Sequence, residues 1–159
     1  MREQIIAASI DSLRQEGLRF SVDTLAERLR ISKKTIYKYF PDKEALARAL
    51  YQTYYDEAVR RLNALLGAHA APDALLHLYF DSKMMIRDDI FNKYKLNDAI
   101  HAYAAGRHDA LWAQLCAALP GASAADGDAL RIIIDGSFEK LCRVKAAPDA
   151  VIERLVTLL

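Results

Sequence analysis

Residues 21–40 read SVDTLAERLRISKKTIYKYF, and this stretch decides the fold. Two short helices are predicted within it, over 22–29 and 33–39, because a serine stands directly before each of them as an N-cap. Residues 30 and 31 leave room only for a tight turn between the two helices. Helix, short turn and helix in this order are typical of a helix-turn-helix motif.

The helix pair is too short to bury its own apolar residues, which are Leu25, Ala26, Leu29, Ile31 and Ile36. A third helix is therefore required, and residues 2–16 supply one with amphipathic spacing. Asp42 then caps a long helix from residue 43 to about residue 66. We expect an N-terminal three-helix head over residues 1–44, joined by the long helix to a helical body over residues 45–159.

The body also has the pattern of helices. They are predicted over 73–86, 98–119 and 124–145 and from Pro148 to Leu159, with a short segment between Asp88 and Tyr94. Nowhere does an alternation of apolar and polar residues persist, so no strand is predicted. The predicted fold class is all-α, with about nine helices.

Positive charge is concentrated near the motif. Residues 1–50 hold ten Lys or Arg against seven Asp or Glu, whereas residues 51–159 hold twelve against fourteen. Within residues 28–43, six basic residues face only Asp42; they are Arg28, Arg30, Lys33, Lys34, Lys38 and Lys43. A compact basic patch on a nearly neutral chain indicates a polyanionic partner.

The second motif helix carries residue types that suit DNA. Lys33, Lys34 and Thr35 stand at its N-terminal end, where side chains can reach base edges in the major groove. The starts of the helices that follow Ser21, Ser32 and Asp42 can attract phosphate through unpaired backbone N–H groups. The alternative is that the lysines form an ordinary solvated surface and that the aromatic residues at 37, 39 and 40 belong to the core.

The same stretch resembles the signature of the tetracycline-repressor (TetR) family. Gly17, SVDTLA at residues 21–26 and ISKKTIYKYFPDKEAL at residues 31–46 carry the resemblance, which extends over about residues 2–50. The rest of the chain resembles the family only in its order of helices. The resemblance implies a homodimeric regulator of transcription that binds a near-palindromic operator in double-stranded DNA, with repression as the default.

The resemblance also implies roles for single residues. Positions that often meet bases or nearby phosphates are matched by Lys33, Lys34 and Tyr37, and phosphate-contacting positions are matched by Thr35, Tyr39 and Lys43. Lys38 matches an exposed position near the DNA backbone, and Ser21 matches the cap of the first motif helix. The full DNA-binding set that we expect is Ser21, Ser32, Lys33, Lys34, Thr35, Tyr37, Lys38, Tyr39 and Lys43.

One residue departs from the family pattern. The family commonly has glycine where this chain has Arg30, because the turn there takes a positive φ. Arginine in that conformation costs on the order of 1 kcal/mol. Either the turn differs slightly, or Arg30 accepts the strain and adds a charge near the duplex.

In the family the body forms the dimer, through the last two helices, and senses a small ligand. Two wide apolar stripes support a dimer here; they comprise Leu130, Ile133, Ile134, Phe138 and Leu141 on one helix and Val151, Ile152, Leu155, Val156 and Leu159 on the next. Gly136 lies in the middle of the first of these helices, where it costs stability unless close packing compensates. The alternative is that both stripes pack on the chain's own body.

The stretch between residues 73 and 119 is rich in aromatic residues, which is typical of a pocket for a small apolar effector. The expected wall consists of Tyr79, Phe80, Phe91, Tyr103 and Trp112. Each of these residues also suits an ordinary core, in which case the body binds a partner protein or has no effector.

Other classes of protein find little support. Cys116 and Cys142 match no zinc or redox spacing and are expected to be small core residues. No nucleophile–base pair, glycine-rich phosphate loop or paired-histidine motif is present, so we expect no enzyme, no cofactor and no metal. The absence of a signal peptide and of a membrane-spanning run predicts a cytoplasmic protein without a membrane partner. Binding to RNA or to a polymerase complex remains as an alternative.

Overall fold

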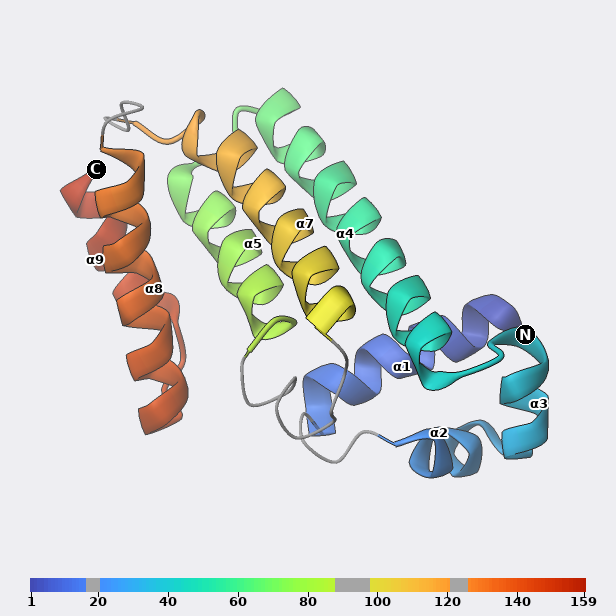
Figure 1. Ribbon diagram of the computed structural model, residues 1–159. Helices are drawn as coiled ribbons and strands as arrows, with labels where there is room; N and C mark the ends of the chain where they lie inside the picture. Colours follow the sequence, from blue (N-terminus) through green and yellow to red (C-terminus); the bar gives the residue numbers. More distant parts are fainter. Residues whose placement is uncertain (17–20, 88–97, 121–125) are drawn as a thin grey trace. The chain divides into compact units, whose positions relative to one another are not determined.

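In a computed structural model, residues 1–16, 21–87, 98–120 and 126–159 are described (Figure 1). Throughout these ranges the regular structure is helical and no strand occurs, which confirms the predicted all-α class. The helices are α1 (Arg2–Glu16), α2 (Val22–Leu29), α3 (Lys33–Tyr39), α4 (Lys43–Gly67), α5 (Pro72–Met84), α7 (Asp98–Cys116), α8 (Gly127–Val144) and α9 (Asp149–Leu158). The segment predicted between Asp88 and Tyr94 lies outside the described residues.

Three predicted helix caps are present. Ser21 Oγ accepts a hydrogen bond from the backbone N–H of Thr24 at 3.1 Å, and Ser32 Oγ accepts one from that of Thr35 at the same distance. Asp42 Oδ1 accepts from the backbone N–H of Ala45 at 2.7 Å. Each cap satisfies a donor that has no partner within its own helix, which is why the three helices begin where they do.

The chain divides into two compact units. Unit 1 comprises Met1–Glu57 and Ser82–His108, and unit 2 comprises Ala58–Asp81 and Asp109–Leu159. Helices α4, α5 and α7 contribute residues to both units. The boundary that the sequence predicts between residues 44 and 45 falls inside unit 1, because the first turns of α4 pack with the head; as a division of function it stays a prediction.

Unit 1 is held together by buried apolar residues and buried phenols. The side chains of Leu25 and Ile36, one from each motif helix, are almost completely buried. Tyr51 and Tyr55 extend from α4 and donate hydrogen bonds to the carbonyls of Met85 and Ser82, at 2.8 and 3.3 Å. Ser82 lies in the last turn of α5, and Met85 directly follows the helix. The two tyrosines therefore connect α4 to the C-terminal end of α5 through hydrogen bonds.

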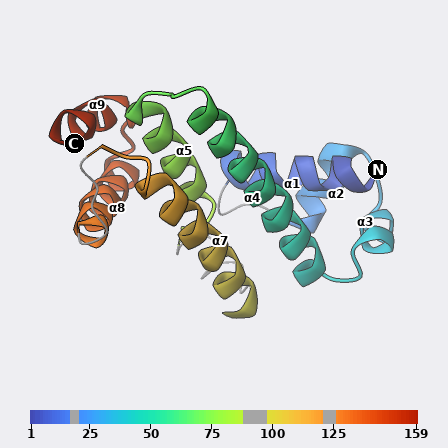
Figure 2. The ribbon, with the colours of Figure 1, turned by 90° about the horizontal axis from the view of Figure 1, so that it is seen from above.

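Unit 2 has an aromatic core. The Tyr79 ring lies 4.9 Å from the Trp112 ring, and Phe80 lies 5.6 Å from Phe138, so α5, α7 and α8 contribute to one cluster. Figure 2 shows α5 and α7 as neighbouring helices from a second direction. The two free cysteines, Cys116 and Cys142, are half-buried. Both cysteines therefore lie at the margin of the core.

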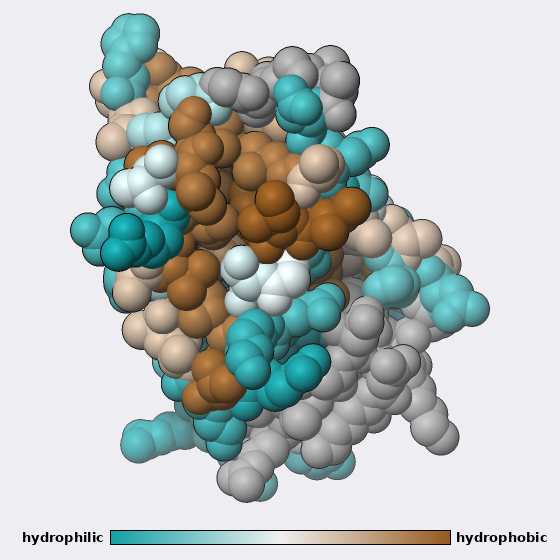
Figure 3. Space-filling view, turned by 90° about the vertical axis from the view of Figure 1, so that its left-hand side faces the viewer, coloured by the Kyte–Doolittle hydropathy of each residue, from teal (hydrophilic) through white to brown (hydrophobic). Residues whose placement is uncertain are grey.

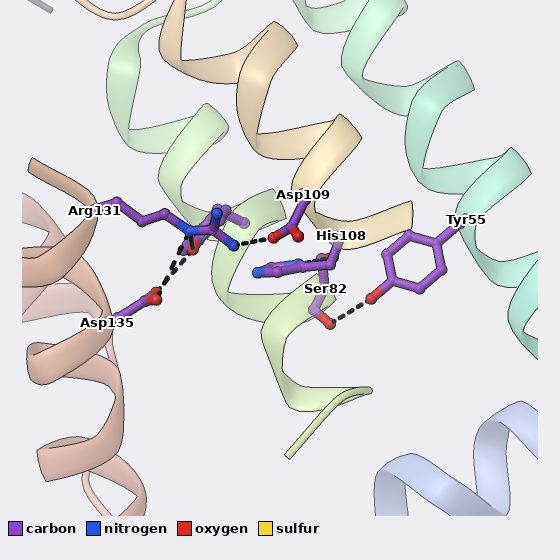
Figure 4. A network of polar contacts seen from close by, with 7 residues as sticks. Tyr55, Ser82, His108, Asp109, Arg131 and Asp135 are labelled. Atoms are coloured by element: carbon purple, nitrogen blue, oxygen red, sulfur yellow. Dashed lines mark hydrogen bonds and ion pairs between the residues drawn. The ribbon is translucent and has the colours of Figure 1, made fainter. Parts of the chain in front are cut away.

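Polar contacts accompany both cores (Figure 4). In unit 2, the phenol of Tyr79 donates a hydrogen bond to Asp135 at 2.7 Å. Arg131 binds Asp109 at 2.5 Å. In unit 1, the hydroxyl of Ser82 lies 2.8 Å from Nδ1 of the buried His108. The contacts in unit 2 connect α8 to α5 and α7, which fixes one face of α8 toward its own unit.

The turn between α2 and α3 requires a left-handed residue. Arg30 has φ 53° and ψ 43°, and its neighbour Ile31 donates a backbone hydrogen bond to the carbonyl of Ala26 at 3.0 Å. The arrangement is a left-handed C-terminal cap of α2, of the kind that glycine adopts without strain. Of the two alternatives that the sequence left open, the structure shows that Arg30 accepts the strain.

We expect Arg30→Gly to raise the free energy of unfolding by about 0.5 kcal/mol. Relief of the left-handed strain outweighs the entropy that glycine adds to the unfolded chain. Urea denaturation measures the effect as a higher midpoint with an unchanged slope. Glu27→Gly in the same helix is the control and costs roughly 1 kcal/mol, because that residue is helical and exposed. A lower urea midpoint for Arg30→Gly than for the wild-type protein would mean that the backbone at Arg30 is not strained.

Candidate nucleic-acid interface

Helix α3 has two distinct faces. Ile36 is buried on one side, and Phe40, the residue after the helix, is buried with it. The Arg2 guanidinium lies 5.2 Å from the centre of the Phe40 ring and covers it. Tyr37 and Tyr39 are 43% and 40% exposed, so both side chains are accessible to a partner. The apolar residues thus anchor the helix while the rest of its surface stays accessible.

A shallow, open hollow lies on the exposed side of α3. It is lined by Ser32, Lys34, Thr35, Tyr37 and Lys38. The hydroxyls of Ser32 and Thr35 lie 2.9 Å apart, so the helix cap and the first turn hold each other in place. Five of the nine residues in the expected DNA-binding set therefore come together on one surface. This surface, which we call the α3 face, offers ammonium, hydroxyl and phenol groups.

Two cations of the basic patch have partners inside the head. Arg28 donates a hydrogen bond to the hydroxyl of Ser12 on α1 at 3.0 Å, and that serine is buried. The ammonium group of Lys33 forms an ion pair with Asp23 on α2. The hydrogen bond and the charge of Asp23 raise the pKa of Lys33. Arg28 thus helps to pack α2 on α1, which the charge pattern alone did not indicate.

The remaining candidates lie at helix starts or near the end of α3. Ser21 is the half-buried cap of α2, and its hydroxyl is held 2.9 Å from that of Thr24. Lys43 is the first residue of α4 and is half-buried; burial lowers the pKa of its ammonium group. Tyr39 closes α3 outside the hollow. All four candidates outside the hollow, Lys33 included, still belong to unit 1.

This geometry agrees with a comparison against protein families. Residues 5–50 match the model of a family described as bacterial regulatory proteins, tetR family. Residues 5–50 therefore form a DNA-binding domain of the tetR family. The match begins in α1 and ends within α4, so it covers the whole helix-turn-helix motif. A search of curated proteins found no match to this chain.

With this domain, the chain is a DNA-binding regulator of transcription. Regulators of this family are generally not enzymes and typically form dimers. No helix among the described residues is both long and apolar enough to cross a membrane. The resemblance drawn from residues 21–46 is thus confirmed, whereas the contacts of single residues with DNA are proposals.

The stripes expected at a tetR-type dimer interface divide into two groups. Five of their members have an exposed fraction of 8% or less within the single chain; they are Ile134, Phe138, Leu141, Ile152 and Leu155. These side chains pack in the chain's own core, as the alternative interpretation held. Leu130, Val151, Val156 and Leu159 are half-exposed, and Ile133 is 55% exposed. Sequence reasoning placed Ile132 beside the first stripe, and that residue is 73% exposed. It left out two exposed apolar residues at the ends of the same helices, Val144 and Leu158.

The expected ligand-contacting residues are also dispersed. Tyr79, Phe80 and Trp112 are buried together in unit 2, where their rings contact one another. Tyr103 is in unit 1, where its hydroxyl accepts a hydrogen bond from Arg107 at 3.1 Å. Phe91 lies outside the described residues. The described structure therefore gathers three of the five candidates, as core residues in contact.

Proposed function

We propose that this tetR-family chain is a repressor that binds a near-palindromic operator as a homodimer, with α3 in the major groove. The observation that carries the proposal is the two-sided character of α3. Its buried side, with Ile36 and Phe40, fixes the helix to the head. Its exposed side presents Lys34, Tyr37 and Lys38 around an open surface. A rigid helix with accessible donors is what the major groove admits.

The proposed contacts follow the chemistry of each side chain. Lys33, Lys34 and Tyr37 approach base edges or nearby phosphates, because they stand in the first turns of α3. Thr35, Tyr39 and Lys43 donate to phosphate oxygens. Lys38 lies near the DNA backbone, and the helix starts at Ser21 and Ser32 present backbone N–H groups to phosphates.

The proposed dimer contact uses the outer surface of α8 and α9. Figure 3 shows hydrophobic side chains gathered on the face that carries these helices. Among the described residues, Ile132, Ile133 and Leu158 are the most exposed of the large apolar side chains. Gly136 lies one turn after Ile132, and a Cβ placed there would meet nothing within 4 Å. A second copy can therefore approach α8 closely at this glycine, which the chain itself does not use for packing.

We further propose that a small apolar molecule bound in the body releases the repressor from DNA. Support comes from the aromatic content of α5 and α7 and from α4, which contributes residues to both units. A ligand that binds the DNA-free arrangement ~100-fold more tightly supplies about 2.7 kcal/mol of coupling. The alternative is regulation by a partner protein, or no effector at all. The ring contacts of Tyr79 with Phe80 and Trp112 favour this alternative, because these side chains pack as core residues.

Selection of bound duplexes from a random pool tests the proposal. We expect enriched sequences with two related half-sites whose centres lie about one helical turn, ~34 Å, apart. The two-fold symmetry of a dimer is the reason for the paired half-sites. Failure to enrich any duplex at low salt contradicts the function and favours an RNA or protein partner. Because its target is DNA, we expect the protein to act in the bacterial cytoplasm.

A further inference from the structure

One lysine of the proposed DNA interface already forms an ion pair with an acidic residue of the same chain. Lys33 is the first residue of α3, and its ammonium group forms an ion pair with the carboxylate of Asp23 on α2. The side chains are 55% and 63% exposed, so both groups remain accessible to solvent and to an approaching partner. The hydrogen bond with Asp23 also raises the pKa of Lys33.

The pair places a phosphate and the Asp23 carboxylate in competition. Each is an anion that accepts hydrogen bonds from an ammonium group, and Lys33 must loosen one to bind the other. An exposed ion pair of this kind exchanges readily, so the pair does not prevent DNA binding. It does lower the net positive charge that α3 presents to an incoming duplex. Lys34 and Lys38 have no such pair with another residue in the described ranges.

We propose that Asp23 is a specificity-determining residue, which competes with DNA phosphates for Lys33 and so weakens binding to non-operator duplexes. The proposal rests on the DNA-binding function proposed above. Non-operator binding depends almost wholly on neutralised phosphates, so the loss of one available cation reduces it strongly. Operator binding also has base contacts, which make it less dependent on that cation. Asp23 thereby widens the ratio between the two affinities.

Glu27 provides a matched control for Asp23. It is an exposed acid on the same helix, and it has no ion pair with a cation of the head in the described residues. Asp23→Asn and Glu27→Gln each remove one negative charge from α2. Any effect of net charge alone is therefore common to both variants, and only Asp23→Asn releases Lys33.

The experiment measures binding of the full chain to a duplex of random sequence over a range of salt concentrations. We expect Asp23→Asn to bind about 5-fold more tightly at low salt, and its salt slope to steepen by about one unit, as for one additional phosphate contact. Glu27→Gln should change the affinity by less than about 2-fold, with an unchanged slope. In a Lys33→Gln background, Asp23→Asn should have no larger effect than Glu27→Gln. Circular dichroism checks that each variant is folded.

A second comparison does not depend on the folding of Asp23→Asn. Because Asp23 already neutralises Lys33, Lys33→Gln should reduce the salt slope for random duplex less than Lys34→Gln does. If Lys33→Gln and Lys34→Gln reduce the salt slope equally, the proposed competition between Asp23 and phosphate is wrong. It is also wrong if Asp23→Asn has the same affinity and salt slope as Glu27→Gln. In either case the wild-type protein still binds duplex, and the proposed function stands. Absence of duplex binding by the wild-type protein overturns both proposals.

Discussion

Replacement of Lys34 and Tyr37 together by alanine lowers affinity for the operator by roughly 100-fold or more. Both side chains line the accessible α3 face, and each contact with a base or a nearby phosphate contributes about 1–3 kcal/mol. Neither side chain belongs to the buried core, so the melting temperature should change little. Titration of the selected operator at fixed salt measures the loss.

Lys38→Ala is the companion variant on the same helix. It removes a charge next to the DNA backbone, so we expect a similar loss for every duplex and a salt slope smaller by about one unit. The double variant at residues 34 and 37 should instead reduce the preference for the operator over random duplex. An unchanged operator affinity in the double variant means that α3 is not the recognition helix.

Ile133→Glu and Ile134→Glu have opposite consequences although the residues are neighbours. Ile133 is 55% exposed on α8, so a charge there leaves the chain folded and prevents a second copy from packing on this surface. Ile134 is fully buried, and an unpaired carboxylate there costs about 4 kcal/mol or more. That cost is comparable to the whole stability of many domains, so we expect this variant to unfold.

Sedimentation and circular dichroism together separate the two outcomes. We expect the wild-type protein to be a dimer at micromolar concentration, Ile133→Glu to be a helical monomer, and Ile134→Glu to lose helical signal. A dimeric Ile133→Glu protein shows that the partner copy packs elsewhere. A folded Ile134→Glu protein shows that this side chain is not in the core.

The head was predictable because its signals are local. Ser21, Ser32 and Asp42 each stand directly before a helix, and each accepts the backbone hydrogen bond that a cap requires. The strain at Arg30 was also visible, since the two-residue turn calls for a left-handed residue. The position of α3 on the head follows from the spacing of its apolar residues.

The sequence pattern did not predict contacts between elements that are distant in sequence. Asp23 and Lys33 lie on different helices, so no periodicity predicts that their charges meet. The hydrogen bond between Tyr79 and Asp135 joins residues 56 positions apart, and it helps to decide which face of α8 turns inward. An apolar stripe as wide as that of α8 has two candidate inner faces. For this reason the sequence could not assign Ile133 to the surface and Ile134 to the core.

Trp112 is the only tryptophan in the chain, and it lies in unit 2 against the Tyr79 ring, with the Arg131 guanidinium 5.9 Å from its ring centre. Intrinsic tryptophan fluorescence therefore originates in the unit that does not contain α3. A rearrangement of the aromatic core around Trp112 would change this emission. A fluorescence change on addition of DNA would thus be an optical measure of communication between head and body, without any attached dye.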